Sequence, residues 1–174
     1  TYKAGDFGFA VIETRTTWPL IVIDSNGRAY TVKVSDLPGG RGDGAPITTL
    51  VEFQDGGKLA QVVTDTPDSV YFFANSGGYG FLCSVADATS RQRAGKAFMS
   101  LEKGEKVLLP AKVFGDWIAA ASENGRILVF PRPEMKTQSG GRGVIVMALD
   151  EGEALAAVAV PADDAVLAVE GIGR

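Results

Sequence analysis

The sequence contains no histidine and only one cysteine, Cys83, among its 174 residues. The absence of histidine excludes imidazole general acid–base catalysis, Ser-His-Asp triads and Cys/His zinc sites. A single cysteine excludes an internal disulfide, which suits a reducing cytoplasm. No apolar run approaches the roughly 18 residues of a membrane span, and residues 1–20 lack the basic start and apolar centre of a signal peptide. We therefore expect a cytoplasmic globular chain with no histidine-based catalytic or metal site.

The chain also lacks an excess of positive charge: it has 17 Lys and Arg against 21 Asp and Glu, so its formal net charge is −4 at pH 7. The negative charge is concentrated in residues 148–170, which contain no basic residue. Local fields govern the encounter with a polyanion more than the total charge does, since charges beyond about 8 Å are screened at physiological salt. A nucleic-acid partner is therefore not excluded. The acidic residues of this segment are Asp150, Glu151, Glu153, Asp163, Asp164 and Glu170.

Glycine is abundant, and three sets of glycines recur about every 48 residues. A shared period in independent markers indicates an internal repeat. The period predicts the tail of one repeat (residues 1–19), three full repeats (20–69, 70–116 and 117–164) and the head of another (165–174). The three sets are Gly27, Gly78, Gly125 and Gly171; Gly44, Gly95 and Gly143; and Gly5, Gly56, Gly104 and Gly152.

Each repeat has the pattern of β-structure. Asn26-Gly27 and Asn124-Gly125 are favoured two-residue hairpin turns between apolar runs, because both central residues of such a turn need positive φ. Further strands are expected after each basic loop and each acidic turn, which makes four strands per repeat, as in a propeller blade. The strands expected after the basic loops are Ile47–Phe53, Ala97–Leu101 and Val144–Leu149, and those after the acidic turns are Leu59–Thr64, Lys106–Val113 and Ala154–Val160.

Five segments, in the same order and register, resemble the C-terminal domains of bacterial type IIA topoisomerases: Tyr2–Asp6, Asp24–Tyr30, Gly78–Cys83, Arg93–Ala97 and Gly125–Pro131. The resemblance implies an all-β β-pinwheel, a propeller-like ring whose blades exchange strands. Residues 1–19 and 161–174 would then pair into a composite fourth blade, or the intact domain would have further blades that this sequence does not include.

Within that family the sequence is more similar to the topoisomerase IV subunit ParC than to the corresponding subunit of gyrase. The glutamine- and arginine-rich, double-glycine box that permits gyrase to wrap DNA has only degenerate counterparts here, in Arg91–Lys96 and Ser139–Gly143. The resemblance therefore implies DNA binding without full gyrase-like wrapping.

The loops Gly39–Gly44, Ser90–Lys96 and Lys136–Gly143 occupy one position per repeat, so we expect them along one rim. Glycine lets a backbone approach a phosphate closely, and arginine and lysine neutralise its charge. The alternative is three solvated hairpin loops. Arg28, Tyr79 and Arg126 follow the inner hairpins and are expected on a different edge. The candidate DNA-binding residues are Arg41, Arg91, Arg93, Lys96, Lys136 and Arg142.

The resemblance implies a non-catalytic, nucleoid-associated domain that binds and bends duplex DNA without sequence specificity and so steers the substrate preference of ATP-dependent strand passage. Neither a cofactor nor a metal is expected in this domain, whereas the parent enzyme would need ATP and Mg. The family's catalytic tyrosine belongs to a separate region. Implied protein partners are the B subunit of topoisomerase IV, through the rest of the parent chain, and the condensin MukB. Two alternatives stay open: a gyrase-type wrapping domain, or a protein-interaction propeller that uses the acidic residues 148–170.

Overall fold

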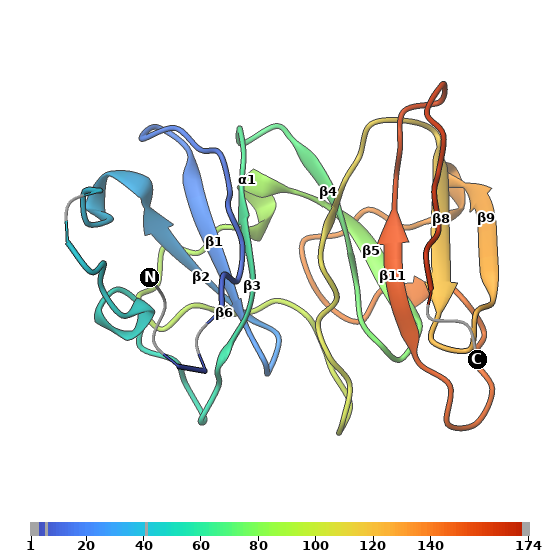
Figure 1. Cartoon of the computed structure of the whole chain (residues 1–174), viewed down its shortest axis with the longest axis horizontal. Helices are drawn as coiled ribbons and strands as arrows, with labels where there is room; N and C mark the ends of the chain where they lie inside the picture. Colours follow the sequence, from blue (N-terminus) through green and yellow to red (C-terminus); the bar gives the residue numbers. More distant parts are fainter. Residues whose placement is uncertain (1–3, 6, 41, 172–174) are drawn as a thin grey trace.

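The computed structural model describes residues 4–5, 7–40 and 42–171. It is built from three antiparallel sheets that stand in a row along the long axis of the molecule (Figure 1). Within the described residues, the only α-helix is the single turn α1 (Val85–Ala88). The all-β class expected from the sequence is confirmed.

The sheets follow the repeats, and each contains a tight hairpin. The first sheet has the order β3-β1-β2-β6, the second β10-β5-β4-β7 and the third β11-β8-β9. Three short 3-10 helices, η1 (Val34–Asp36), η2 (Ile47–Thr49) and η3 (Arg132–Glu134), lie in the connections. The strands are β1 (Pro19–Asp24), β2 (Arg28–Lys33), β3 (Leu59–Thr64), β4 (Val70–Ala74), β5 (Tyr79–Ser84), β6 (Lys96–Ala97), β7 (Ala111–Lys112), β8 (Trp117–Ser122), β9 (Ile127–Pro131), β10 (Val144–Ile145) and β11 (Leu155–Ala159).

Neighbouring repeats exchange strands. β6 belongs to the second repeat but pairs with β2 of the first, where Lys96 lies opposite Ala29. β10 belongs to the third repeat but pairs with β5 of the second, where Val144 lies opposite Gly80. This is the exchange that the β-pinwheel resemblance implied, and it means that each repeat completes the sheet of the repeat before it.

The hairpin glycines Gly27, Gly78 and Gly125 occupy equivalent places, with φ of 83°, 87° and 82°. Only glycine adopts this left-handed conformation without steric cost. The residue three positions earlier stabilises each turn with its side-chain oxygen. Asp24 Oδ1, for example, accepts hydrogen bonds from the backbone N–H groups of Asn26 and Arg28. The glycine period therefore records a real structural repeat.

The prediction that Gly171 is the fourth member of this set of hairpin glycines is wrong. Gly171 lies outside any turn and has no left-handed φ. A 48-residue interval is seen instead among three later sites. These are the turn Pro67-Asp68 before β4, the bend Gly115-Asp116 before β8 and the turn Asp163-Asp164 before the C-terminal segment.

Several expected strands are shorter or absent. β6 and β10 have two residues each, and only Ala111–Lys112 of the expected Lys106–Val113 is strand. Ile47–Phe53 forms η2 instead, where the N–H groups of Leu50 and Val51 bond to the carbonyl of Ile47. The cause is the exchange itself: in the described residues the first repeat has no preceding sheet to pair with, so its backbone bonds locally.

The composite fourth blade is also not formed within the described residues. The described residues before β1 (4–5 and 7–18) and after β11 (160–171) contain no strand and lie toward opposite ends of the row (Figure 1).

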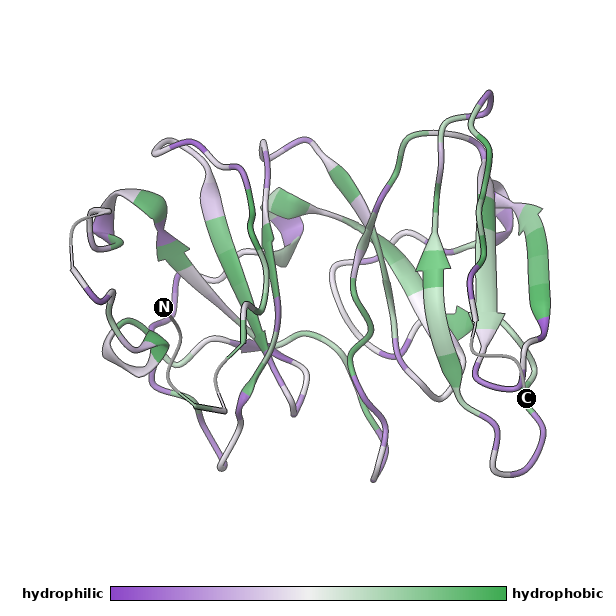
Figure 2. Cartoon of the chain, viewed as in Figure 1, coloured by the Kyte–Doolittle hydropathy of each residue, from purple (hydrophilic) through white to green (hydrophobic). Residues whose placement is uncertain are grey.

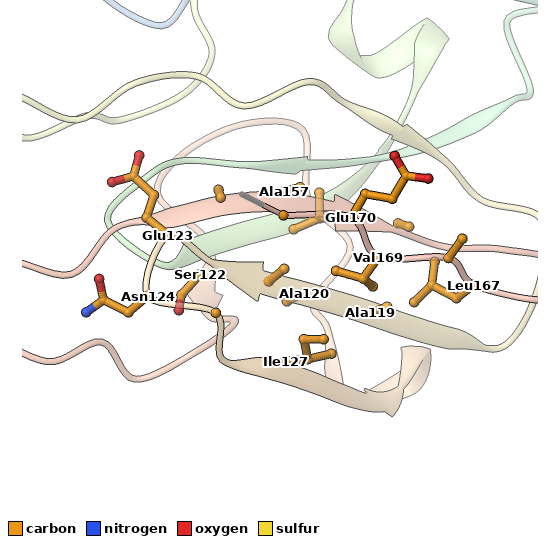
Figure 3. A pocket seen from close by; sticks show the side chains of 17 residues that line it. Ala119, Ala120, Ser122, Glu123, Asn124, Ile127, Ala157, Leu167, Val169 and Glu170 are labelled. Atoms are coloured by element: carbon orange, nitrogen blue, oxygen red, sulfur yellow. The ribbon is translucent and has the colours of Figure 1, made fainter. Parts of the chain in front are cut away.

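Apolar side chains fill the spaces between the sheets, and Figure 2 shows hydrophobic strands joined by hydrophilic loops. Between the first and second sheets, Ile21 and Ile23 pack with Phe73 and Phe98, whose rings meet edge to face at 4.9 Å. A second cluster joins the second and third sheets. A third covers the outer face of the first sheet with the loop after β2. Among the described residues, residues 167–171 lie over the outer face of the third sheet and leave a cavity of about 630 Å³ (Figure 3).

Candidate nucleic-acid interface

The loop Ser90–Lys96 is attached along β2 of the first sheet. The N–H of Ser90 donates to Thr31 Oγ1 at 2.8 Å. Gly95 has φ 69°, and a Cβ at this position would lie 2.6 Å from the carbonyl oxygen of Ala29. Only glycine permits this approach, so Gly95 sets the position of the charged residues around it.

Three cations lie in this loop, and no carboxylate occurs between residues 89 and 100. Arg91 and Arg93 are exposed, and neither forms an ion pair with any residue that the structure describes. Lys96 is half-buried: its Nζ donates to the carbonyl of Asp87 and lies 5.7 Å from the centre of the Phe98 ring.

Arg28 also belongs to this surface, contrary to the sequence expectation that it lies on another edge. Its Nη2 donates to the carbonyl oxygen of Ala94 at 2.7 Å. Strand exchange is the reason, because it lays the loop of the second repeat over the hairpin of the first. We call the surface formed by Arg28, Arg91, Arg93 and Lys96 the basic edge.

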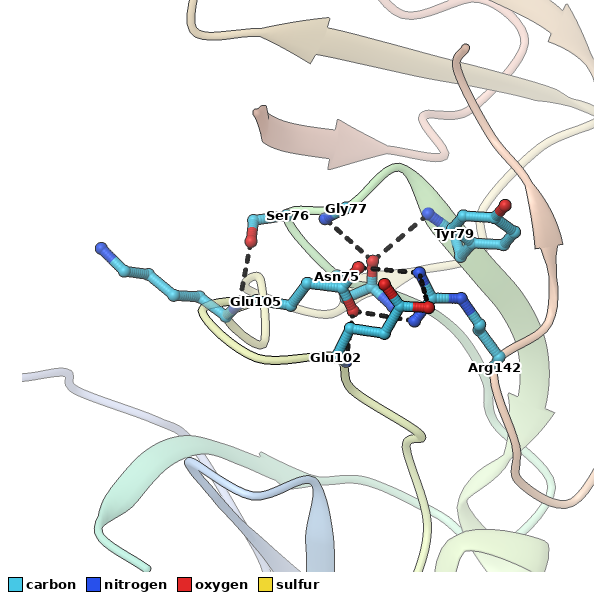
Figure 4. A network of polar contacts seen from close by, with 8 residues as sticks. Asn75, Ser76, Gly77, Tyr79, Glu102, Glu105 and Arg142 are labelled. Carbon is cyan, nitrogen blue, oxygen red and sulfur yellow. Dashed lines mark hydrogen bonds and ion pairs between the residues drawn. The ribbon is translucent and has the colours of Figure 1, made fainter. Parts of the chain in front are cut away.

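The equivalent loop of the third repeat presents a different environment. Arg142 forms two hydrogen bonds with the Glu105 carboxylate, at 2.7 and 2.9 Å, and stacks 4.1 Å from the centre of the Tyr79 ring (Figure 4). Glu102 lies 3.6 Å away. The hydrogen bonds from Arg142 lower the pKa of Glu105, and those to Glu105 raise the pKa of Arg142. The charge of Arg142 is therefore already compensated.

Tyr79 was expected, like Arg28, on an edge away from the basic loops, and that expectation is also wrong. Its ring contacts Arg142 of the loop Lys136–Gly143. In both sheets the residue after the hairpin glycine meets the loop of the next repeat.

The remaining candidates are dispersed. Lys136 is exposed beside β5, where its carbonyl accepts a hydrogen bond from Leu82 N. Arg41 lies outside the described residues. Of the five candidates that the structure describes, it thus brings together Arg91, Arg93 and Lys96.

Arg126, on the third sheet, is paired in the same manner as Arg142. Its Nη1 lies 2.6 Å from Glu153 Oε2 and 3.5 Å from Asp150 Oδ2. Glu153 is buried and also accepts hydrogen bonds from Ser122 Oγ and Asp150 N. These hydrogen bonds, that from Ser122 foremost, lower the pKa of Glu153.

The tyrosines at positions 30 and 71 act in structural hydrogen bonds. Tyr30 donates to Asp24, and Tyr71 donates to Asp65 at 2.9 Å. Burial and the adjacent carboxylate raise the pKa of Tyr71 well above its usual range, so its hydroxyl stays protonated.

Two further searches of the described residues bear on function. No group of three or more His, Cys, Asp or Glu side chains that could hold a metal ion is present among them. No helix within the described part of the chain has the length and hydrophobicity needed to cross a membrane.

Comparison with known proteins gives consistent matches. Residues 70–112 and 116–162 match the family model described as DNA gyrase C-terminal domain, beta-propeller. The A subunit of DNA topoisomerase 4 from Neisseria gonorrhoeae is 37% identical over 155 residues, which cover 85% of this chain and 20% of that protein. The Escherichia coli K12 protein of the same name is 32% identical over 155 residues, covering 88% and 21%. The chain thus spans about a fifth of the length of these relatives.

Solved structures agree. The structure of the E. coli ParC C-terminal domain matches with a TM-score of 0.84 at 29% identity, over 93% of this chain and 69% of that one. A DNA gyrase A C-terminal domain matches with a TM-score of 0.66 at 20% identity, over 84% and 48%, and supports the fold alone.

Proposed function

Because the chain belongs to the family of DNA gyrase C-terminal β-propeller domains, we propose that it is the non-catalytic DNA-binding domain of a ParC-type topoisomerase IV chain. The observation that carries the proposal is the basic edge, where four cations gather around a loop that Gly95 holds against β2. The two most exposed of them, Arg91 and Arg93, have no carboxylate partner among the described residues.

The contact is with the DNA backbone rather than with base edges. Reading bases in the major groove requires a helix or a two-stranded ribbon that enters it. The longest α-helix in the described residues has four residues, and the two most exposed cations of the basic edge, Arg91 and Arg93, lie in a glycine-containing loop. Such a surface neutralises phosphates and positions the duplex without sequence information. Bending a duplex against it favours arms that are already curved or crossed, because deforming stiff DNA costs several kcal/mol.

The other activities belong to the parent protein in this proposal. ATP- and Mg-dependent strand passage, the catalytic tyrosine and the contact with the B subunit of topoisomerase IV lie in the remainder of the parent chain, and this domain needs no cofactor.

The test is a charge reversal, Arg91→Glu with Arg93→Glu, assayed by titration of linear duplex DNA at several salt concentrations. Losing two phosphate contacts should reduce the log–log salt slope by about 1.8 and weaken binding roughly tenfold or more at low salt. Both side chains are exposed, so the melting temperature should hardly change. Lys96 is left intact because it bonds to the backbone of α1.

The matched control is Lys103→Glu with Lys106→Glu, two exposed lysines of an acidic turn in the same repeat. It makes the same change in net charge. Equal weakening by both variants would mean diffuse attraction and would refute the basic edge. Unchanged binding in both would refute DNA contact through this surface.

A further inference from the structure

A hollow of about 300 Å³ lies on the first sheet, beside the basic edge. Trp18 and Pro19 line it from the turn that leads into β1, and Thr31 and Lys33 line it from the C-terminal half of β2. Thr31 connects the hollow to the basic edge, because its Oγ1 accepts the hydrogen bond from the N–H of Ser90, the first residue of the basic loop. The hollow and the basic edge therefore form one continuous surface.

Two cations lie at this hollow, and they come from different elements. Arg15 belongs to the turn, where its carbonyl oxygen accepts a hydrogen bond from the N–H of Trp18 at 2.9 Å. Its guanidinium lies 5.4 Å from the centre of the Trp18 ring. Lys33 lies on β2, opposite Pro19 of β1. Because stacking on an aromatic ring orients a guanidinium without neutralising it, both positive charges remain at the surface.

Neither cation is compensated by a carboxylate. Arg15 and Lys33 are exposed, and neither forms an ion pair with any described residue. Asp36, in the connection after β2, instead accepts a hydrogen bond from the neighbouring serine hydroxyl at 3.3 Å. Arg126 and Arg142, by contrast, are each paired with a glutamate. The electrostatic character of the hollow is thus that of the basic edge.

The hollow also presents hydroxyl groups. Thr16 and Thr17 line it together with Thr31. Thr31 Oγ1 accepts a hydrogen bond from Ser90, and no described residue accepts one from Thr31 Oγ1 in turn. Arginine, lysine and threonine side chains are the groups that commonly bond to phosphate oxygens of nucleic acids. The chemistry of the hollow therefore matches a phosphate group.

The same position differs in the other two sheets. The residue six places after the hairpin glycine is Lys33 in the first sheet, Ser84 in the second and Pro131 in the third. A cation at this position is thus a property of the first sheet, which also carries the basic edge.

We propose that this hollow is a second phosphate-binding site, which receives the backbone of the same duplex that contacts the basic edge. The proposal rests on the proposed function, because it requires DNA to lie on the basic edge. Lys33 and Arg15 neutralise phosphate charge at the hollow, and the threonine hydroxyls donate to phosphate oxygens. The DNA contact then extends from the loop Ser90–Lys96 along β2 to the turn before β1.

Neutralisation of both cations, Arg15→Gln with Lys33→Gln, tests the proposal by titration of a long linear duplex at several salt concentrations. Losing two phosphate contacts should reduce the log–log salt slope by about 1.8. The melting temperature should hardly change, because both side chains are exposed. If Arg15→Gln disturbs the turn, Lys33→Gln alone should still reduce the slope by about 0.9.

The matched control is Lys103→Gln with Lys106→Gln, which makes the same change in net charge at two exposed lysines and should leave the slope unchanged. An unchanged slope in the Arg15 and Lys33 variant would overturn the proposal. Equal reductions in that variant and the control would also overturn it, because they would indicate diffuse attraction.

The basic-edge variant, Arg91→Glu with Arg93→Glu, separates this proposal from the proposed function. If it weakens binding while the Arg15 and Lys33 variant does not, the basic edge binds DNA and the second site does not exist. If neither variant weakens binding, DNA contact through the first sheet is refuted and both proposals fail.

Tryptophan fluorescence gives a local readout. The chain has two tryptophans, so Trp117→Phe leaves Trp18, which lines the hollow, as the sole emitter. Its emission should change on addition of duplex DNA, with the same midpoint as binding. The reciprocal variant, Trp18→Phe, leaves Trp117 on the third sheet and should show no change. Constant Trp18 emission throughout the titration would contradict contact at the hollow.

Discussion

The edges of the first and third sheets both carry an arginine at the same place in the repeat, but the two arginines have different partners. In both, an arginine follows the hairpin glycine: Arg28 in the first and Arg126 in the third. Arg28 bonds to a loop carbonyl and forms no ion pair with any described residue, whereas Arg126 is paired with Glu153. The comparison shows that the position of a cation in the repeat does not decide whether it can meet DNA. The carboxylates around it decide.

One position in the acidic turn accounts for the difference. It is Glu105 in the second repeat and Glu153 in the third, but Gly57 in the first. A Cβ at Gly57 would lie 2.6 Å from Asp24 Oδ2, so the Asp24 carboxylate already fills this space. Asp24 is itself occupied by Tyr30 and two backbone N–H groups. The first sheet therefore has no equivalent glutamate to neutralise its outer arginine.

The largest expected effect concerns the junctions between sheets. Gly143→Ala should destabilise the chain by about 3 kcal/mol, because its Cβ would lie 2.0 Å from the carbonyl oxygen of Gly80 and its φ is 82°. Gly44→Ala, with φ 77° and open space in the described structure, should cost only about 1 kcal/mol. Urea denaturation measures both. Equal losses in the free energy of unfolding would mean that the two loops are in equivalent environments and would contradict the expected difference between Gly143 and Gly44.

Next in size is the removal of the buried carboxylate of the third sheet. Glu153→Gln removes the negative charge closest to Arg126, which keeps only the more distant Asp150, and places an amide donor near the N–H of Asp150. We expect the melting temperature to fall by about 5 °C and DNA affinity to rise, because Arg126 becomes available. Glu151→Gln, an exposed residue of the same turn, should change the melting temperature little. A stable Glu153→Gln protein with unchanged DNA affinity would argue against neutralisation.

The stability of the chain should also depend on pH, through the carboxylate of Asp65. Burial opposes its ionisation, but hydrogen bonds from Lys112, Thr66, Ser69 and Tyr71 outweigh burial and lower its pKa to about 2. A depressed folded-state pKa contributes stability that is fully present above the unfolded value near 3.8 and is lost as pH falls toward 2. After allowance for screening by solvent, this contribution is about 1–2 kcal/mol. Asp65→Asn should remove that part of the pH dependence from urea denaturation curves measured between pH 5 and pH 2.

The smallest effect tests the two arginines directly. Arg28→Gln should reduce the log–log salt slope of DNA binding by about 0.9, the equivalent of one phosphate contact, whereas Arg126→Gln should leave it unchanged. Titrations of the same duplex at four salt concentrations distinguish the two. A reduced slope for Arg126→Gln would show that its ion pair opens when DNA binds.

The hairpins were predictable because left-handed turns demand glycine, so Gly27, Gly78 and Gly125 mark them in the sequence itself. The surface was less predictable. Arg28 meets Ala94, 66 residues away, only through strand exchange. The pairing of Arg142 with Glu105 spans 37 residues and has no local signal. The sequence contains one indication that the charges at the edges differ: the position after the acidic-turn glycine is glycine in the first repeat, at Gly57, and glutamate in the later two, at Glu105 and Glu153.

Strand exchange also sets an order for folding during synthesis. The outer strand of each sheet, β6 for the first and β10 for the second, emerges one repeat after the hairpin that it covers. At about 5–20 residues per second, a ribosome needs several seconds to make a repeat. During that time β2 or β5 has no partner on its outer edge. The sheets are therefore completed one after another, starting from the N-terminal side. A nascent chain of this fold is therefore most open to mispairing in the interval before β6 or β10 pairs with its edge strand, rather than while a single hairpin forms.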